Sequence, residues 1–359
     1  MSDSPKPQLR EEMAALPTYK AGKKVAPVNG LTAFKLSSNE NAHPPLPGVL
    51  AAITAAALEI NRYPDPFCGE LTKAIAEKFD VTIDEVATGT GSVGVCQQII
   101  QAIAGTGDEV MYAWRSFEAY PIITTIAGAT NVAVPLTASG EHDLAAMLAA
   151  ITPKTRVIFV CTPNNPTGGI VTQQQITKFL NQVPTDILVV IDEAYVEFNC
   201  DPNAIDGIAT MKAHTNVGVL RTFSKAYGLA GLRVGYFIGP KHIAEAVRKT
   251  AVPFGVSNIA QTAAVVSLAN EAELFERVEQ VIAQRTWFEN ELTKLGFVLP
   301  TSQANFVWLP LGDRTLDFVA KSEGIAVAIR PFPGEGVRIS IGEREGLERI
   351  IELAKDFVS

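Results

Sequence analysis

The sequence has few of the residues that would indicate a nucleic-acid surface or a metal site. Its 30 lysines and arginines are outnumbered by 38 acidic residues, which gives a formal net charge of −8. Proteins that bind the phosphate backbone of nucleic acids are usually basic, so this charge disfavours that class. The four cysteines form no Cys-x-x-Cys pair and have no histidine at a metal-ligand spacing. We therefore expect reduced thiols, no metal ion and a cytoplasmic protein.

Long apolar runs are also missing. No apolar stretch follows the first residues, so we expect no signal peptide. The most apolar early segment, Val49 to Ile60, is too short for a membrane span and is typical of a helix on a protein surface.

Hydrophobic residues make up 47% of the 359 residues, which is enough for a sizeable core. A chain of this length is expected to form two domains. We predict an N-terminal arm over 1–35, a large domain over 36–250 and a small C-terminal domain over 251–359.

Short runs rich in β-branched residues alternate with helical stretches in the middle of the chain. The expected strands are Val86–Thr88, Glu109–Tyr112, Asn131–Val134, Val157–Cys161, Ile187–Ile191 and Gly218–Leu220, and expected helices include Gly69–Phe79, Val93–Ala104 and Gln173–Asn181. Nearly continuous apolar strands between helices predict an α/β fold of three layers, α/β/α, with a mostly parallel sheet. Ligands bind beyond the carboxyl ends of such strands.

The last hundred residues have a different pattern. A long helical run, Ala260 to Leu295, precedes expected strands at Asn305–Leu309, Ile325–Ile329 and Gly336–Ile341, and a last helix covers Gly346–Phe357. This order predicts a smaller α+β domain.

Residues 89–94, Gly-Thr-Gly-Ser-Val-Gly, follow an expected strand and precede a helix. Glycines and a helix N-terminus suit a phosphate group. The spacing also matches the dinucleotide fingerprint, and Arg115 after the next strand would suit a 2′-phosphate. From this segment alone, a nicotinamide-dependent oxidoreductase and a turn without a ligand both remain open.

Two further strand ends carry polar residues. Asn165 lies in an Asn-Asn-Pro-Thr-Gly turn, which is either an ordinary turn or a donor to a ring oxygen. Asp192 ends an apolar strand, where a carboxylate is costly unless a donor or a cation satisfies it. It is either a helix cap or salt-bridge partner, or the carboxylate that keeps a pyridine nitrogen protonated.

The fourth strand-end loop contains Lys225. A surface position is usual for lysine, but a lysine desolvated beside Arg233 would have a lowered pKa and attack an aldehyde. Thr222, Ser224 and Arg233 offer phosphate donors on the same loop. One ligand, a phosphorylated pyridine aldehyde, accounts for all four loops, whereas a dinucleotide accounts only for the first.

The motifs Asn-Asn-Pro-Thr-Gly, Asp-Glu-Ala-Tyr and Thr-Phe-Ser-Lys-x-x-Gly-Leu-Ala-Gly-Leu-Arg-x-Gly resemble those of the fold-type I aminotransferases. Within them the chain resembles the histidinol-phosphate aminotransferase group, and most of all its aromatic amino acid (phenylalanine) aminotransferase branch. The resemblance extends from Leu36 to Gly342. It implies pyridoxal 5′-phosphate as cofactor.

The resemblance also implies a role for each matched position. Lys225 would form the internal aldimine, Asp192 would pair with the pyridine nitrogen, and Phe117 would stack on the ring. Asn165 and Tyr195 would contact the ring hydroxyl. The residues that would hold the phosphate are Gly91, Ser92, Val93, Thr222, Ser224 and Arg233.

Tyr63 matches a tyrosine that reaches the phosphate from the neighbouring subunit, which implies a homodimer with shared sites. Arg338 matches the arginine that binds the substrate α-carboxylate, a task suited to a bidentate guanidinium. Asn39 is placed with the substrate-binding residues, and Tyr19 either lines the pocket or has a packing role.

The substrate depends on the segment between two arginines. Arg330 and Arg338 would suit two anionic groups, as in glutamate or histidinol phosphate. The loop between them is short and carries Phe332, and residues 114–118 depart from the pattern of histidinol-phosphate enzymes. Both departures resemble the aromatic branch.

We therefore expect phenylalanine and tyrosine as amino donors, with tryptophan as a further candidate. 2-Oxoglutarate is the expected acceptor, in a ping-pong reaction through the Lys225 aldimine. The alternative is a histidinol-phosphate aminotransferase of histidine biosynthesis. A non-enzymatic regulator of this fold is also conceivable, although no helix-turn-helix is evident.

Overall fold

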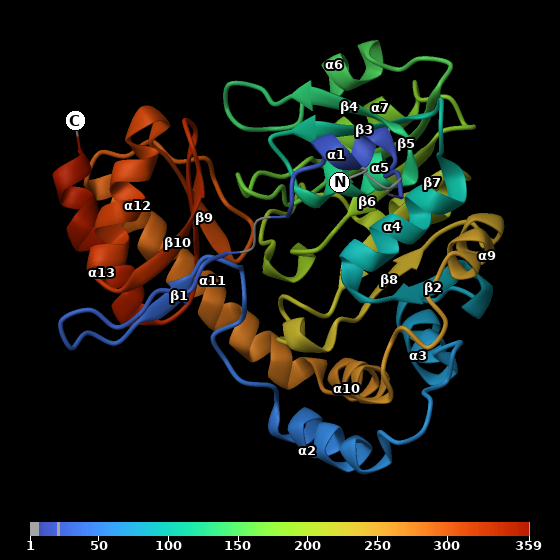
Figure 1. The fold of residues 1–359 in the computed structure, drawn as a ribbon, viewed down its shortest axis with the longest axis horizontal. Helices are drawn as coiled ribbons and strands as arrows, with labels where there is room; N and C mark the ends of the chain where they lie inside the picture. Colours follow the sequence, from blue (N-terminus) through green and yellow to red (C-terminus); the bar gives the residue numbers. More distant parts are fainter. Residues whose placement is uncertain (1–6, 20–21, 359) are drawn as a thin grey trace, which may run out of the picture.

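The computed structural model of the protein describes residues 7–19 and 22–358. Figure 1 shows two parts, a larger one and a smaller one built mainly from the C-terminal third of the chain. The long helix α11 (Glu271–Lys294) runs from one part to the other.

Strands of the larger sheet carry apolar side chains on both faces, which explains why both faces are covered. In β5 (Thr155–Cys161), Val157 and Phe159 belong to one buried cluster, and Ile158 and Val160 to another. Successive side chains of a strand point to opposite faces, so each cluster marks one face of the sheet.

The larger sheet has seven strands in the order β2-β8-β7-β6-β5-β3-β4. Besides β5 they are β2 (Val86–Gly89), β3 (Glu109–Trp114), β4 (Thr130–Pro135), β6 (Leu188–Asp192), β7 (Val217–Thr222) and β8 (Gly235–Ile238). Strand β8 runs antiparallel to both of its neighbours, and the other pairs are parallel.

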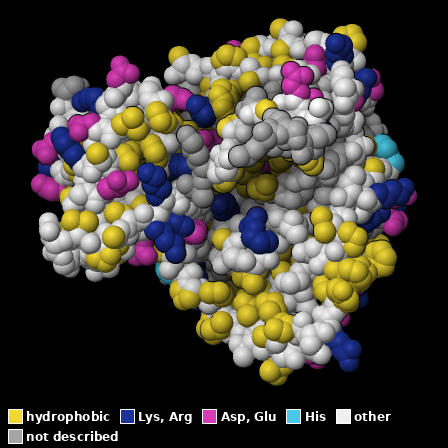
Figure 2. Space-filling view, in the orientation of Figure 1, with side chains coloured by type: hydrophobic (Ala, Val, Ile, Leu, Met, Phe, Trp, Pro, Cys, Tyr) yellow, Lys and Arg dark blue, Asp and Glu magenta, His cyan; other side chains and the backbone are white. Residues whose placement is uncertain are grey.

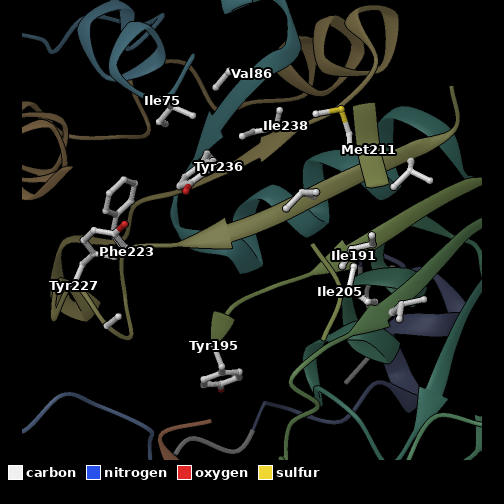
Figure 3. Packing of buried hydrophobic residues seen from close by; sticks show 14 of the residues in the cluster. Ile75, Val86, Ile191, Tyr195, Ile205, Met211, Phe223, Tyr227, Tyr236 and Ile238 are labelled. Atoms are coloured by element: carbon white, nitrogen blue, oxygen red, sulfur yellow. The ribbon is translucent and has the colours of Figure 1, made fainter. Parts of the chain in front are cut away.

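Helices form the outer layers. The face buried with Phe159 is covered by α4 (Gly91–Ile103), α5 (Ala119–Ala127) and α9 (Lys241–Lys249). The other face is covered by α3 (Gly69–Phe79), α6 (Leu144–Ala149), α7 (Gln173–Leu180) and α8 (Gly207–Ala213). Figure 3 shows part of this second cluster, where the rings of Phe223, Tyr227 and Tyr236 pack together. The predicted three-layer α/β/α arrangement is confirmed.

The smaller sheet has four strands in the order β1-β10-β11-β9. They are β1 (Phe34–Leu36), β9 (Phe306–Pro310), β10 (Val327–Phe332) and β11 (Gly336–Ser340). Helices α11, α12 (Thr315–Gly324) and α13 (Arg344–Ala354) bury a third apolar cluster against it. The predicted α+β character of the C-terminal part is confirmed.

The remaining elements are short or peripheral. They are α1 (Glu11–Ala15), α2 (Pro47–Ala56), α10 (Asn258–Ala269) and the 3₁₀ helices Ala57–Glu59, Ile83–Glu85, Val196–Phe198, Ala230–Leu232, Gly312–Arg314 and Lys355–Phe357. Within the described chain, no helix has both the length and the apolar character needed to cross a membrane.

The structure differs from the sequence expectation in three elements. The expected helix Ala260 to Leu295 is two helices, because α10 ends at Ala269 and α11 begins at Glu271. The side chain of Asn270, between them, donates to the carbonyl of Val266. Strand β8 was not expected, since its four residues follow the glycine-rich Lys225 loop. Strand β1 was assigned to the arm and the large domain, yet it pairs with β10.

The predicted domain bounds stay a prediction. Strand β1 lies before or at the predicted start of the large domain, yet it belongs to the smaller sheet. Helix α10 lies after the predicted boundary at 250, yet it packs on α2 and α3 of the larger part. Both elements therefore pack against a different part of the molecule from the one that the predicted bounds assign to them.

A buried carboxyl group, that of Glu197, makes the stability of the larger part depend on pH. Arg221 at the end of β7 pairs with Glu193, with an Nη2–Oε2 distance of 2.7 Å. Glu197 lies near this pair, but its Oε2 is buried without a hydrogen-bond partner in the described chain. Burial raises its pKa from 4.5 to about 7, against the opposing effect of Arg221.

We predict that Glu197→Gln flattens the pH dependence of stability. A raised carboxyl pKa favours the folded state below about pH 4.5, and this contribution is lost as the pH rises through about 7. The full shift corresponds to at most about 3 kcal/mol. Melting temperatures at pH 5 and pH 8 should differ less in Glu197→Gln than in the wild type. The exposed control Glu276→Gln should keep the wild-type difference; an unchanged difference in Glu197→Gln would contradict the assignment.

Candidate active site

A cavity of about 530 Å³ lies at the carboxyl ends of the parallel strands. The loops after β2, β3, β5, β6 and β7 line one side, and β10 and β11 line the other. Every predicted site residue lines this cavity except Gly91, which adjoins Ser92, and Tyr63. The cavity lies where a parallel sheet is expected to bind its ligand, and both the ligand site and the individual roles remain predictions.

Lys225 enters the cavity from the loop after β7. Its Nζ lies 3.5 Å from the carbonyl oxygen of Ser38 and 5.7 Å from the centre of the Tyr195 ring. Burial, followed by the positive charges of Arg338 and Arg233, lowers the pKa of this amine to about 7. Arg233 was the expected cause, but Arg338 contributes more. The amine is therefore partly neutral near pH 7.

Asp192 ends β6 on the cavity floor, where it is buried. Its Oδ2 accepts a hydrogen bond from the Tyr120 hydroxyl at 2.5 Å, and its Oδ1 accepts one from the backbone of Ala194 at 3.2 Å. Burial raises the pKa of Asp192 to about 6, although both hydrogen bonds act in the opposite direction. A cation or a protonated ring nitrogen beside this carboxylate would be stabilised by it.

Arg338 in β11 connects the two sides of the cavity. Its Nη1 donates to Oδ1 of Asn165 at 2.6 Å, and its Nη2 donates to the carbonyl of Ser37 at 2.9 Å. Its Nε is buried and has no partner in the described chain. Both acceptors are neutral, so the guanidinium remains suited to a carboxylate.

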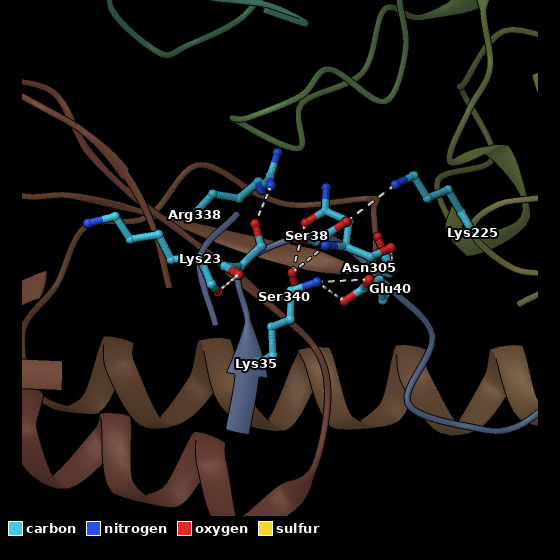
Figure 4. Close-up of polar contacts among 10 residues, drawn as sticks. Lys23, Lys35, Ser38, Glu40, Lys225, Asn305, Arg338 and Ser340 are labelled. Carbon is cyan, nitrogen blue, oxygen red and sulfur yellow. Dashed lines mark hydrogen bonds and ion pairs between the residues drawn. The ribbon is translucent and has the colours of Figure 1, made fainter. Parts of the chain in front are cut away.

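Tyr195 is held in place by a short polar network. Its hydroxyl accepts a hydrogen bond from Nδ2 of Asn39 at 2.9 Å. Asn39 has a φ of 53°, in the left-handed region. Its backbone N–H donates to Oγ of Ser340, and the Ser340 hydroxyl donates to Oδ1 of Asn39. Figure 4 shows Ser340 and Arg338 on one side of this network and Lys225 reaching it from the other.

The first turn of α4 and the Lys225 loop approach closely enough to form an anion cradle. A Cβ on Gly91 would run into the guanidinium of Arg233, and a Cβ on Gly235 would lie 2.6 Å from the backbone nitrogen of Ser92. Arg233 also donates to Oγ of Ser224 at 3.3 Å. The start of α4 has no side-chain cap, so its N–H groups stay available. This donor set fits a phosphate.

Aromatic side chains form the wall above Asp192. Phe117 lines the cavity, and its ring meets the ring of Tyr120 edge-on at 5.5 Å between centroids. Tyr120 in turn stacks on Phe159 at 4.7 Å. A flat ring lying over Asp192 would therefore contact an aromatic surface.

Arg330 does not stand alone beside Arg338. The two residues are directly opposite in the β10–β11 pairing. Arg330 Nη2 lies 2.5 Å from Oε2 of Glu118, and Arg115 pairs with Glu335. The sequence predicts that Arg330 and Arg338 can both bind anionic groups of a substrate. The structure changes this expectation, because the carboxylate of Glu118 already pairs with Arg330.

Two predicted residues lie away from the cavity centre. Tyr63 is 83% exposed, and its ring contacts Phe254 at 4.7 Å rather than the cavity. Tyr19 is half-exposed at the cavity rim, where it also borders a second cavity.

Tyr120 and Glu118 have no role in the prediction made from the sequence. Both contact residues that were singled out, Asp192 and Arg330. The short spacing between Phe117 and Tyr120 offered a signal for Tyr120, since the turn that leads into α5 brings the two rings together. Nothing in the sequence pointed from Glu118 to a strand more than 200 residues away.

These residues can hold one ligand at several points. A phosphate fits the start of α4 with Ser224 and Arg233, and a ring nitrogen fits Asp192. An aldehyde would lie near Lys225, whose lowered pKa favours nucleophilic attack. The geometry fits the phosphorylated pyridine aldehyde expected from the sequence.

Comparison with known proteins gives a consistent result. A family model described as aminotransferase class I and II matches residues 32–353. An aromatic amino acid aminotransferase of Streptomyces avermitilis is 55% identical over 351 residues, 98% of each chain. One of Thermobifida fusca is 50% identical over 357 residues, 99% of each chain.

A solved structure has the same fold. Histidinol-phosphate aminotransferase from Sinorhizobium meliloti, in complex with pyridoxal-5′-phosphate, matches with a TM-score of 0.88. It is 26% identical, and the match covers 99% of both chains.

We predict that Lys225 reacts with a small aldehyde at neutral pH. With a pKa of about 7, about half of its amine is neutral at that pH, against roughly one part in a thousand for an ordinary lysine. Reductive methylation of the cofactor-free protein at pH 7, followed by peptide mass spectrometry, should label Lys225 ahead of exposed Lys294. Labelling should rise through about pH 7 and then level off. Equal rates for the two lysines would exclude a lowered pKa.

Proposed function

The chain belongs to the class I and II aminotransferase family, and from this premise we propose that it transaminates aromatic amino acids at the Lys225 cavity. Pyridoxal phosphate is the cofactor. The observation that carries the proposal is the position of Lys225, with a pKa of about 7, beside Asp192 and a phosphate cradle in one cavity. The glycine-rich turn that also matched a dinucleotide site is part of this cradle.

Bound pyridoxal phosphate supplies an electron-accepting ring for the carbanion that forms at the substrate Cα. The phosphate would be held by the start of α4, Ser224 and Arg233. Asp192 would face the ring nitrogen and keep it protonated, and Tyr195 and Asn165 would contact the ring hydroxyl. Phe117 would cover one face of the ring.

Lys225 would move the proton. Its Nζ is partly neutral near pH 7, as a general base requires. It would take a proton from the substrate Cα and return one later as the general acid. The Ser38 carbonyl, 3.5 Å away, would help to hold the amine in place.

Arg338 would bind and orient the substrate. Its guanidinium is buried and contacts only neutral acceptors among the described residues, and its Nε has no partner there. A substrate α-carboxylate would complete this set with charge-assisted hydrogen bonds. Because Asn165 contacts both Arg338 and the expected ring position, it would align the carboxylate with the ring.

Aromatic amino donors are supported by the relatives and by the pocket. The two relatives compared above are aromatic amino acid aminotransferases at 55% and 50% identity. Ile122, Ile123 and Phe332 give the cavity an apolar wall, and Glu118 offsets the charge of Arg330. We propose phenylalanine and tyrosine as donors, 2-oxoglutarate as acceptor and a ping-pong reaction. Cytoplasmic location remains a prediction from cysteine usage.

A homodimer with shared sites is supported by an exposed apolar surface near Tyr63. Figure 2 shows hydrophobic side chains gathered over the region of α2. The exposed large side chains there are Leu50, Leu58, Ile60, Tyr63 and Phe67. Contiguous apolar surface of this kind marks association sites.

We predict a substrate order of phenylalanine and tyrosine above histidinol phosphate. Initial rates with 2-oxoglutarate should give kcat/KM values for the aromatic donors that are at least about tenfold higher than the value for histidinol phosphate. The phosphate would have to break the Glu118–Arg330 pair, and the loss of one such pair corresponds to about that factor. Lys225→Ala should lose the visible absorbance of the bound cofactor and all turnover. Faster turnover of histidinol phosphate would favour the alternative assignment, whereas a protein that binds no pyridoxal phosphate would remove the aminotransferase proposal.

We predict that one impaired variant and one inactive variant restore activity when their subunits mix. Tyr63→Ala should weaken cofactor binding by about tenfold, and Lys225→Ala should be inactive. A mixed dimer would hold one site with both substitutions and one site with neither. Co-refolding the two proteins should therefore give more activity, at limiting cofactor, than the sum of the separate proteins. No gain on mixing would contradict a site shared between subunits.

A further inference from the structure

Two ion pairs flank Phe332 at the mouth of the cavity. Arg330 pairs with Glu118, and Arg115 pairs with Glu335. The guanidinium carbons of Arg330 and Arg115 lie 5.7 and 5.6 Å from the centre of the Phe332 ring. The group thus contains two cations and two anions and is electrically balanced before any substrate is present.

This balance suits an uncharged substrate side chain. An aromatic ring adds no charge beside Phe332, so both pairs can persist when it binds. The distal carboxylate of an acidic substrate, or the phosphate of histidinol phosphate, would be a third anion beside two cations. Uncompensated charge in a partly buried site is costly, so such a ligand needs one of the two carboxylates to leave.

Glu118 is the carboxylate able to leave. Its side chain is 30% exposed, against 9% for that of Arg330, so moving Glu118 costs less desolvation than moving the arginine. Glu118 immediately precedes α5, whereas Arg330 is fixed within β10.

Glu118 also borders the space into which it can move. A second cavity of about 560 Å³ adjoins the first and is lined by Glu118 together with Trp114, Arg115 and Ile122. Glu118 and Ile122 line both cavities. A change of side-chain rotamer would take the Glu118 carboxylate away from Arg330 and into this second cavity.

We propose that Glu118 determines which class of substrate side chain the site accepts, a proposal that rests on the aminotransferase function. With Glu118 on Arg330, the site takes uncharged aromatic side chains. The distal carboxylate of an acidic substrate displaces Glu118 from Arg330 into the second cavity, so the same pocket serves both halves of the reaction. When no acidic substrate is bound, the Glu118 carboxylate occupies the position beside Arg330 that the distal carboxylate of such a substrate would take.

The test measures binding of two non-reactive ligands to the holoenzyme by calorimetry. Glutarate represents an acidic substrate and 3-phenylpropionate an aromatic one. Glu118→Gln removes the competing anion, so the affinity for glutarate relative to 3-phenylpropionate should rise about tenfold. The ratio of the KM values for phenylalanine and glutamate should shift in the same direction.

Glu335→Gln is the matched control. It changes the net charge of the group by the same amount but leaves the Glu118–Arg330 pair in place. Its affinity ratio should change by less than about threefold, because an exposed pair contributes little. An equal change in both variants would mean that net charge alone acts, and would overturn the proposal.

Other outcomes are equally decisive. An unchanged ratio in Glu118→Gln, or equal weakening of both ligands, would make Glu118 a structural residue only. If Glu118→Gln fails to fold, Glu118→Ala provides the same comparison. A wild-type holoenzyme that transaminates neither phenylalanine nor glutamate would refute the proposed function, while the affinity ratios would still test the role of Glu118.

Discussion

Burial of opposite charges in one cavity is the constraint on which the rest of the site depends. Asp192 and Lys225 both lie where water is scarce, and burial moves their pKa values toward neutrality from opposite directions, to about 6 and about 7. Neither forms an ion pair with the other in the structure; Tyr120 and Ser38 are their hydrogen-bond partners. Both groups are therefore able to change protonation state when a ligand arrives, which is the property that a proton-transfer site requires.

The two sheets supply complementary halves of this environment. The larger sheet provides Asp192, Lys225 and the anion cradle at the start of α4, whereas the smaller sheet provides Arg330 and Arg338 on neighbouring strands. Arg338 crosses between the halves through its bond to Asn165. The geometry of the cavity therefore depends on how the sheets are held together, and a change in their packing would alter the cavity without changing a residue that lines it.

The three-layer fold could be predicted from the sequence, because buried parallel strands are apolar along their length. The position of the cavity could be predicted because the few polar residues near these strands lie in the loops at their ends. Asp192 and Lys225 stood out for that reason. Contacts between distant segments could not be predicted from local patterns. Glu118 meets Arg330 and Tyr120 meets Asp192 only after folding, and the break at Asn270 lies within an otherwise helical pattern.

Strand β1 also bears on the order in which the molecule forms during synthesis. It is the first strand made, yet Phe34 pairs with Val327 of β10, almost at the end of the chain. Pairings between such distant residues form late and slowly. The larger sheet can be complete while β1 still has no partner, and the segment that follows β1, with Ser37, Ser38 and Asn39, cannot take its place until β10 emerges. Because these residues border the cavity, the larger sheet can form during synthesis before the wall of the cavity is complete.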